Sequence, residues 1–289
     1  MTGTAKITAI APWFGGKRTL APRIVEELGP HRFYVEPFCG SMAVLLAKPE
    51  ATTEMVCDLH GDLVNLGQVI QHPVDGPRLY RRLRRCWMSE AEHAEAKRRM
   101  AEPFRPGVSR AFDYFVFSWM GRNGVSGTVT SNVTFARRFT PNGGQGGKRF
   151  HSAVQSIPGW RQRLRNVNIL RCDGFGVLEK LDDADGVAVY MDPPYLVKGA
   201  KYVHDFSVAD HRRLAELAGR FRLARVVVSY YDHPALAELY PGWTKRVIEV
   251  SKALAHQGRR GTNDTKASEV LLINGPSLAG EPEEARLFA

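Results

Sequence analysis

Residues 192–195, Asp-Pro-Pro-Tyr, combine the groups needed to hold a planar amine. The carboxylate of Asp192 and a proline carbonyl can accept N–H hydrogen bonds, and the ring of Tyr195 can stack on a flat base. Cytosine, adenine and amide nitrogens all meet this description, so the tetrapeptide alone leaves the type of amine open. The predicted catalytic residues are Asp192, Pro193, Pro194 and Tyr195.

A second segment, residues 33–41, has the pattern of a strand, a tight turn and a helix start. Gly40 allows a close backbone approach, and a helix start near Ser41 offers free N–H groups to a carboxylate or a phosphate. Asp58 follows at roughly the 20-residue spacing at which an acid reaches ribose hydroxyls in dinucleotide-binding folds. Taken alone, an adenosine-bearing cofactor and an ordinary turn with a surface carboxylate explain these features equally well, and the tetrapeptide suited to base amines favours the cofactor.

Near the N-terminus, the run Trp13–Lys17 combines aromatic rings, flexible backbone and a cation. It differs from a phosphate-binding P-loop, because Arg18 stands where that motif needs Ser or Thr.

The elements expected to position these motifs alternate between strands and helices. The catalytic tetrapeptide follows the apolar run Val187–Met191, a predicted buried strand that the two prolines end. In open α/β sheets ligands bind at the carboxyl ends of strands. Further strands are predicted at 33–36, 54–58, 167–170 and 225–230, a hairpin at 247–250 and 269–273, and helices from 41, over about 76–100 and at 211–221. The pattern predicts an α/β fold with a mostly parallel sheet.

Composition and charge favour a folded protein with an anionic partner. The 289 residues are 44% hydrophobic and 24% charged, and the formal net charge is +10, which points first to nucleic acid. Residues 114–172 contain no Asp or Glu, and glycine-rich runs at 121–124 and 142–147 predict loops there. The four cysteines form no Cys-x-x-Cys pair, which favours reduced thiols in a cytoplasmic protein. No apolar run has membrane-spanning length.

Taken in order, these motifs resemble those of the Dam-like, D12 class DNA adenine-N6 methyltransferase family. The matching pieces are Trp13–Lys17, Val35–Ser41, Asp58 and Asp192–Tyr195, with shorter similarities at 172–175, 206–211 and 266–272. The resemblance implies a Rossmann-like methyltransferase fold dependent on S-adenosylmethionine (SAM), with a C-terminal antiparallel hairpin. Residues 1–60 and 166–289 would form the catalytic domain, and 61–165 an inserted, mainly helical target-recognition domain.

The resemblance also implies a reaction and its residues. A methyl group would pass from SAM to the exocyclic amine of an adenine flipped out of double-stranded DNA, without a metal. The implied cofactor residues are Trp13, Gly15, Gly16, Lys17, Glu36, Pro37, Phe38, Gly40, Ser41, Asp58, Asp173, Gly174, Phe175 and Asp192. The predicted DNA contacts are Arg122, Asn123, Arg137, Arg138, Lys148 and Arg149. Residues 128–147 depart from the Dam pattern, so the target sequence stays open.

Two other hypotheses remain at this stage. One is methylation of an amine on RNA or a protein amide, although proteins that methylate glutamine typically carry Asn where Asp192 stands. The other is a DNA-binding module with an inactive cofactor site. In each case we expect a monomer or weak dimer in the cytoplasm of a bacterial or phage-infected cell.

Overall fold

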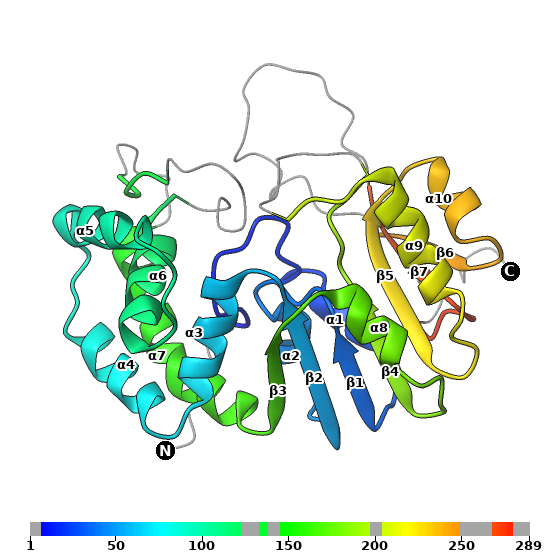
Figure 1. The fold of residues 1–289 in the computed structure, drawn as a ribbon, viewed down its shortest axis with the longest axis horizontal. Helices are drawn as coiled ribbons and strands as arrows, with labels where there is room; N and C mark the ends of the chain where they lie inside the picture. Colours follow the sequence, from blue (N-terminus) through cyan, green and yellow to red (C-terminus); the bar gives the residue numbers. More distant parts are fainter. Residues whose placement is uncertain (1–6, 123–132, 138–144, 197–203, 249–267, 280–289) are drawn as a thin grey trace, which may run out of the picture.

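The chain folds around a twisted sheet of seven strands with helices on both faces (Figure 1). This computed structural model describes residues 7–122, 133–137, 145–196, 204–248 and 268–279. The strands are β1 (Phe33–Glu36), β2 (Thr53–Asp58), β3 (Val167–Arg171), β4 (Val187–Met191), β5 (Arg225–Tyr231), β6 (Thr244–Ile248) and β7 (Glu269–Ile273). Their order is β3-β2-β1-β4-β5-β7-β6. Strands β1 to β5 run parallel, and β7 runs antiparallel to both β5 and β6, which confirms the predicted Rossmann-like sheet with its terminal hairpin.

The helices precede, separate and follow these strands. They are α1 (Ala21–Leu28), α2 (Ala43–Ala47), α3 (Gly61–Gln71), α4 (Asp75–Arg84), α5 (Glu90–Met100), α6 (Val108–Met120), α7 (Gly146–Leu164), α8 (Gly174–Lys180), α9 (Val208–Ala218) and α10 (Ala235–Leu239). Within the described ranges, no helix is both long and apolar enough to cross a bilayer.

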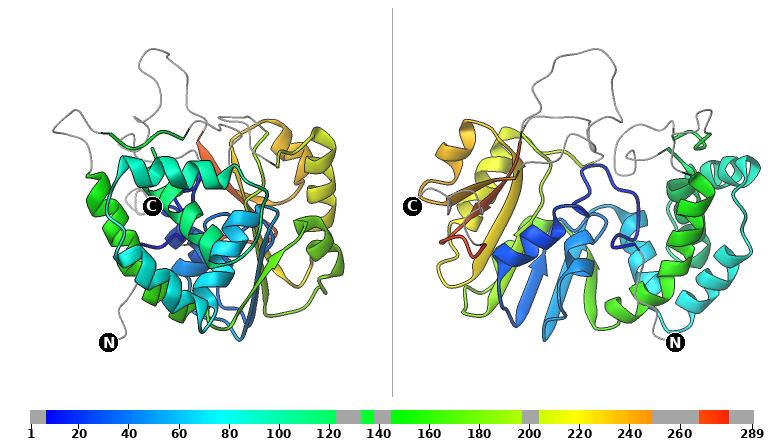
Figure 2. Two further views of the ribbon diagram at one scale, coloured as in Figure 1. Left: turned by 60° about the vertical axis from the view of Figure 1, so that its left-hand side comes forward. Right: turned by 180° about the vertical axis from the view of Figure 1, so that it is seen from behind.

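Alternation along the strands divides the hydrophobic interior into two cores. On β1, Tyr34 belongs to a core shared with α1, α3, α6 and α7, while Val35 belongs to a core shared with α8 and α9. On β4, Tyr190 and Val189 divide in the same way. Seen from behind, α1 lies in front of the sheet, and α8 and α9 lie on the opposite face (Figure 2). Both faces are therefore covered, as parallel strands require.

The strand order reverses between β1 and β4. From β1 the chain order runs outward through β2 and β3, and from β4 it runs the other way to β5. Register pairs Val35 with Val189, so the two strands end side by side, at Glu36 and just before Asp192. In doubly wound sheets this switch point is where ligands bind.

The helices α3 to α7 lie beside the β3 edge of the sheet (Figure 1). The predicted helical stretch at 76–100 is two helices, because Ser89 caps a new start by accepting the N–H of Glu92. The loop predicted over 142–147 is wrong at its end: Gly146 and Gly147 begin α7. From Phe150 to Trp160, side chains at three- to four-residue spacing are buried along one face of α7. This packing stabilises the helix, which therefore includes the two glycines before Phe150. The predicted domain boundaries stay a prediction.

Two buried tryptophans fix the N-terminal segment. The indole N–H of Trp119 on α6 donates to the carbonyl of Ile10 at 3.1 Å, and that of Trp160 on α7 donates to the carbonyl of Ile7 at 2.5 Å. The N–H of Ile10 in turn donates to the carbonyl of Ser41, next to α2. These bonds position the following run, Trp13–Lys17, near the carboxyl end of β1.

Candidate active site

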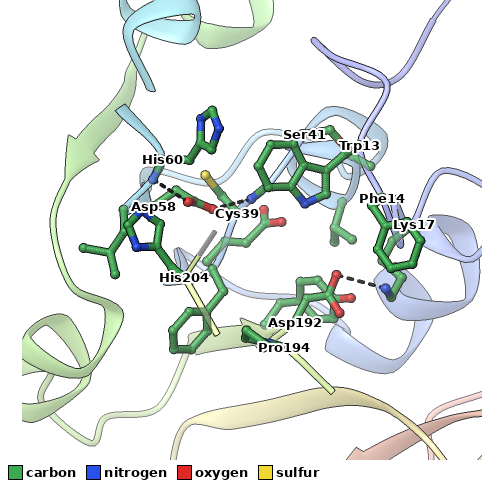
Figure 3. Close-up of a pocket in the computed structure, with 18 of the residues that line it drawn as sticks. Trp13, Phe14, Lys17, Cys39, Ser41, Asp58, His60, Asp192, Pro194 and His204 are labelled. Carbon is green, nitrogen blue, oxygen red and sulfur yellow. Dashed lines mark hydrogen bonds and ion pairs between the residues drawn. The ribbon is translucent and has the colours of Figure 1, made fainter. Parts of the chain in front are cut away.

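A pocket opens at the switch point and gathers most of the predicted site residues (Figure 3). Those that line it are Trp13, Gly16, Lys17, Glu36, Phe38, Gly40, Ser41, Asp58, Asp173, Asp192 and Pro194. The predicted residues outside its lining are Gly15, Pro37, Gly174, Phe175, Pro193 and Tyr195. Lining residues that sequence reasoning did not assign to the site are Phe14, Cys39, Ala43, Val44, Leu59, His60, Tyr190, His204 and Phe206.

Asp58 is held in one orientation at the end of β2. Its Oδ2 accepts the backbone N–H of Gly40 and its Oδ1 accepts that of His60, each at 2.9 Å. Gly40 has a φ of 44°, and a side chain there would meet the indole nitrogen of Trp13 at 2.9 Å. The Trp13 ring lies edge-on to His60, with ring centroids 5.3 Å apart. Trp13, Gly40 and Asp58 thus form one closely packed wall, which explains the need for glycine.

Three phenylalanines build another wall, in which Phe38 and Phe206 line the pocket and Phe175 packs against them. Phe175 stacks on Phe206, with centroids 5.3 Å apart, and Phe38 meets Phe206 edge-on at 5.6 Å. A side chain at Gly174 would lie 2.6 Å from the carbonyl of Pro37, so the start of α8 packs directly on the β1 turn. Gly174, Phe175 and Pro37 do not line the pocket and instead pack against the residues that do.

Asp173 stands at the rim of that wall and caps α8. Its Oδ1 accepts the N–H of Phe175 at 3.1 Å. The side chain is exposed and still lines the pocket.

Glu36 lies buried at the base of the pocket. The hydroxyl of Tyr34 donates to its Oε2 at 2.9 Å. Burial raises the pKa of Glu36 to about 8, and the negative charge of Asp192 adds to this, although the Tyr34 bond acts the other way. Glu36 is therefore protonated at neutral pH unless a cationic group lies against it.

Asp192, directly after β4, forms an ion pair with Lys17. The Lys17 ammonium lies 3.0 Å from Oδ2 of Asp192, donates to the carbonyl of Gly15 at 2.6 Å, and lies 3.2 Å from Oε1 of Glu269. Burial raises the pKa of Asp192 to about 6 even though Lys17 lowers it. Asp192 is consequently a carboxylate at neutral pH.

Tyr195 lies beneath this ion pair and is 7% exposed. Its hydroxyl donates to Oε1 of Glu269 at 2.7 Å, its ring meets that of Tyr231 at 4.6 Å, and the Lys17 ammonium lies 5.0 Å from its ring centroid. The structure therefore places Tyr195 in the packing under the site, and its predicted stacking on a base stays a prediction.

Some predicted DNA contacts already have protein partners. Arg149 donates to the carbonyls of Trp119 and Gly121 at 2.7 Å each, which satisfies the end of α6. Arg137 forms an exposed ion pair with Glu90. Arg122 and Lys148 are exposed. Asn123 and Arg138 lie outside the described residues.

Two residues near the chemistry carry little sequence signal. Glu269 opens a predicted strand, where an acid is expected to face solvent, and His60 caps α3 although histidine is not among the residues preferred at a helix start. The one sequence signal for Glu269 is that an acid stands directly before the apolar run Val270–Ile273.

The sheet and the pocket at its switch point define a Rossmann-like α/β protein with a ligand site of carboxylates and aromatic rings. Comparison with known proteins is more specific. The sequence profile of the D12 class N6 adenine-specific DNA methyltransferases matches residues 13–254. The chain belongs to this family. It is also 23% identical over 274 residues to the retron Ec67 DNA adenine methylase of Escherichia coli, spanning 93% of this chain and 92% of that protein.

Proposed function

We propose that the protein transfers a methyl group from SAM to the N6 amine of an adenine flipped out of double-stranded DNA. The observation that carries this proposal is the position of Asp192. It stands at the carboxyl end of β4 in the pocket that also contains Asp58 and Glu36. An amine acceptor and candidate cofactor groups thus share one cavity.

The charge of the pocket suits SAM. In a chain of net charge +10, the described charged residues that line the pocket are Lys17 and the four acids Glu36, Asp58, Asp173 and Asp192. SAM carries an ammonium and a sulfonium, and a cation beside Glu36 would hold that carboxyl ionised. Asp58 would accept the ribose hydroxyls, and the wall of Phe38, Phe175 and Phe206 would receive the adenine ring.

SAM, when bound, supplies an activated methyl group on a positively charged sulfur. The residues of the chain must make the amine a better nucleophile, because the N6 lone pair is delocalised into the ring. The Asp192 carboxylate and the Pro193 carbonyl would accept the two amine hydrogens, raise the electron density on nitrogen and favour a pyramidal geometry. Asp192 acts here as a hydrogen-bond acceptor and can receive the amine proton afterwards.

Lys17 and the net positive charge serve this chemistry in different ways. Lys17 binds Oδ2 of Asp192, which would leave Oδ1 to accept a hydrogen bond from the amine. The positive charge of the chain favours binding to phosphates. Flipping the adenine costs a few kcal/mol, which contacts in the pocket must offset.

The test is to incubate the protein with SAM and DNA of varied sequence, digest the DNA to nucleosides and quantify N6-methyldeoxyadenosine by mass spectrometry. Asp192→Asn should lower the rate by about 100-fold or more, since it replaces a charged acceptor. The matched control Asp182→Asn removes an exposed carboxylate and should retain the wild-type rate. Absence of methyladenine with the wild-type protein on all DNA would refute the proposal. Adding RNA as a competitor, and measuring how far it lowers methylation of DNA, shows which of the two nucleic acids the protein prefers.

A further inference from the structure

We propose that Glu269 is a positioning residue of the reaction: it shares the charge of Lys17 with Asp192, so that Asp192 stays a strong hydrogen-bond acceptor. The rate effects below rest on the proposed function. The effect on Asp192 itself does not, and it can be measured without any methyl transfer.

Topology explains how a residue from the far end of the chain reaches this site. Glu269 is the first residue of β7, which runs antiparallel to β5. An antiparallel strand begins where its parallel neighbours end, and register places Glu269 opposite Tyr231, the last residue of β5. Since β5 adjoins β4, Glu269 arrives beside the carboxyl end of β4, next to the segment Asp192–Tyr195.

The contacts of Glu269 join the two sides of the catalytic segment. Its Oε1 lies 3.2 Å from the Lys17 ammonium and accepts the Tyr195 hydroxyl at 2.7 Å. The side chains of Lys17 and Glu269 are 5% and 13% exposed, so water screens this pair weakly. Glu269 therefore fixes the partner of Asp192 on one side and Tyr195, three residues further on, on the other.

The charges decide what this arrangement does. One ammonium faces two carboxylates, Asp192 at 3.0 Å and Glu269 at 3.2 Å. If Glu269 were neutral, the full charge of Lys17 would act on Asp192, stabilise its ionised form and weaken it as an acceptor for an amine. The negative charge of Glu269 accordingly acts to raise the pKa of Asp192.

Several titratable groups act on Asp192, and Glu269 is one of them. The titratable groups that face it from the N-terminal segment, β1, β4 and its following turn, β5 and β7 are Lys17, Glu36, Tyr190, Tyr195, Tyr230, Tyr231 and Glu269. Among these, Glu269→Gln changes a single charge and keeps the side-chain shape.

The experiment compares wild type, Glu269→Gln and Glu269→Asp, with Glu216→Gln on the exposed face of α9 as a control for the loss of one negative charge. Steady-state rates on DNA are measured from pH 5 to 8. In parallel, carbon-13 NMR follows the aspartate carboxyl groups, and the Asp192 signal is assigned from its absence in Asp192→Asn. Glu269→Asp keeps the charge, and so remains informative if the amide variant does not fold.

In Glu269→Gln we expect the Asp192 midpoint and the acidic limb of the rate profile to move down by about half a pH unit or more. kcat should fall about threefold to tenfold, as for a weakened hydrogen bond, with KM for SAM unchanged. Glu269→Asp should recover most of the midpoint, and Glu216→Gln should match wild type. Two results would overturn the inference. One is an Asp192 midpoint that does not move in Glu269→Gln. The other is an Asp192 midpoint that moves in Glu269→Asp as far as complete loss of the charge would move it. If instead the NMR midpoint moves but the wild type methylates no DNA, the proposed function fails and the coupling stands.

Discussion

Asp58→Asn is the sharpest test of the cofactor half of the pocket, because both oxygens of Asp58 are in use. Oδ2 accepts the N–H of Gly40 and Oδ1 accepts the N–H of His60, each at 2.9 Å. An asparagine side chain offers one oxygen and one NH₂ group. One of the two backbone N–H groups would then face another donor, and the side chain would swing away from its present orientation.

The expected loss follows from the bonds that Asp58 would make to the ribose hydroxyls. A hydrogen bond to a charged group contributes about 1.5–3 kcal/mol, so SAM should bind about 10- to 150-fold more weakly to Asp58→Asn. Isothermal calorimetry measures this directly. S-adenosylhomocysteine shares the ribose and lacks the sulfonium charge, so its affinity should fall by the same factor.

Asp182→Asn provides the matched control, since Asp182 is exposed and this change also removes one carboxylate. Its affinity for SAM should equal that of wild type. If Asp58→Asn bound SAM as tightly as wild type while remaining folded by circular dichroism, Asp58 would not contact the ribose. Unequal losses for the two ligands would place Asp58 near the sulfur instead.

Three further predictions concern other parts of the site. Because burial raises the pKa of Asp192 to about 6 and the reaction needs its ionised form, kcat/KM for DNA at saturating SAM should be constant above that value and fall about tenfold per unit well below it, measured by methyl transfer across pH. Gly40→Ala would strain a backbone at φ 44° and bring a methyl group 2.9 Å from the Trp13 indole nitrogen, so calorimetry should find SAM binding weakened about tenfold or more; wild-type affinity would contradict the packing argument. Lys148→Ala should reduce the slope of log affinity for DNA against log salt by about 0.9, whereas the exposed Lys180→Ala on α8 should leave it unchanged; equal slopes would remove Lys148 from the DNA interface.

The sequence predicted the sheet well because its strands are short apolar runs bounded by turn residues. Val187–Met191 was predicted with the bounds that the structure has. The strand predicted to start at Val247 starts at Thr244 instead, since the first three residues of this edge strand are polar or charged and hide its beginning. Gly146 and Gly147 were wrongly predicted to lie in a loop, because tertiary packing of α7 overrides the local preference of glycine for loops.

The candidate site was predictable where the motif is local in sequence. Glu36 and Asp58 end strands and Asp192 directly follows one, and parallel strands bring such residues together in one pocket. Glu269 was not assigned to the site, because its place depends on an antiparallel strand that joins the sheet last. Tyr195 was assigned a role at the pocket surface, and its burial follows from Tyr230 and Tyr231 on β5, which no local pattern reveals.

The N-terminal segment has a consequence for modularity. Trp119 and Trp160 belong to helices within the predicted insertion, yet they hold the carbonyls of Ile10 and Ile7, and the same segment carries Lys17 to Asp192. Excision of residues 61–165 would therefore remove the two indole hydrogen bonds that hold the segment carrying Lys17. When these helices are exchanged between relatives, the N-terminal residues that Trp119 and Trp160 bind must be exchanged with them.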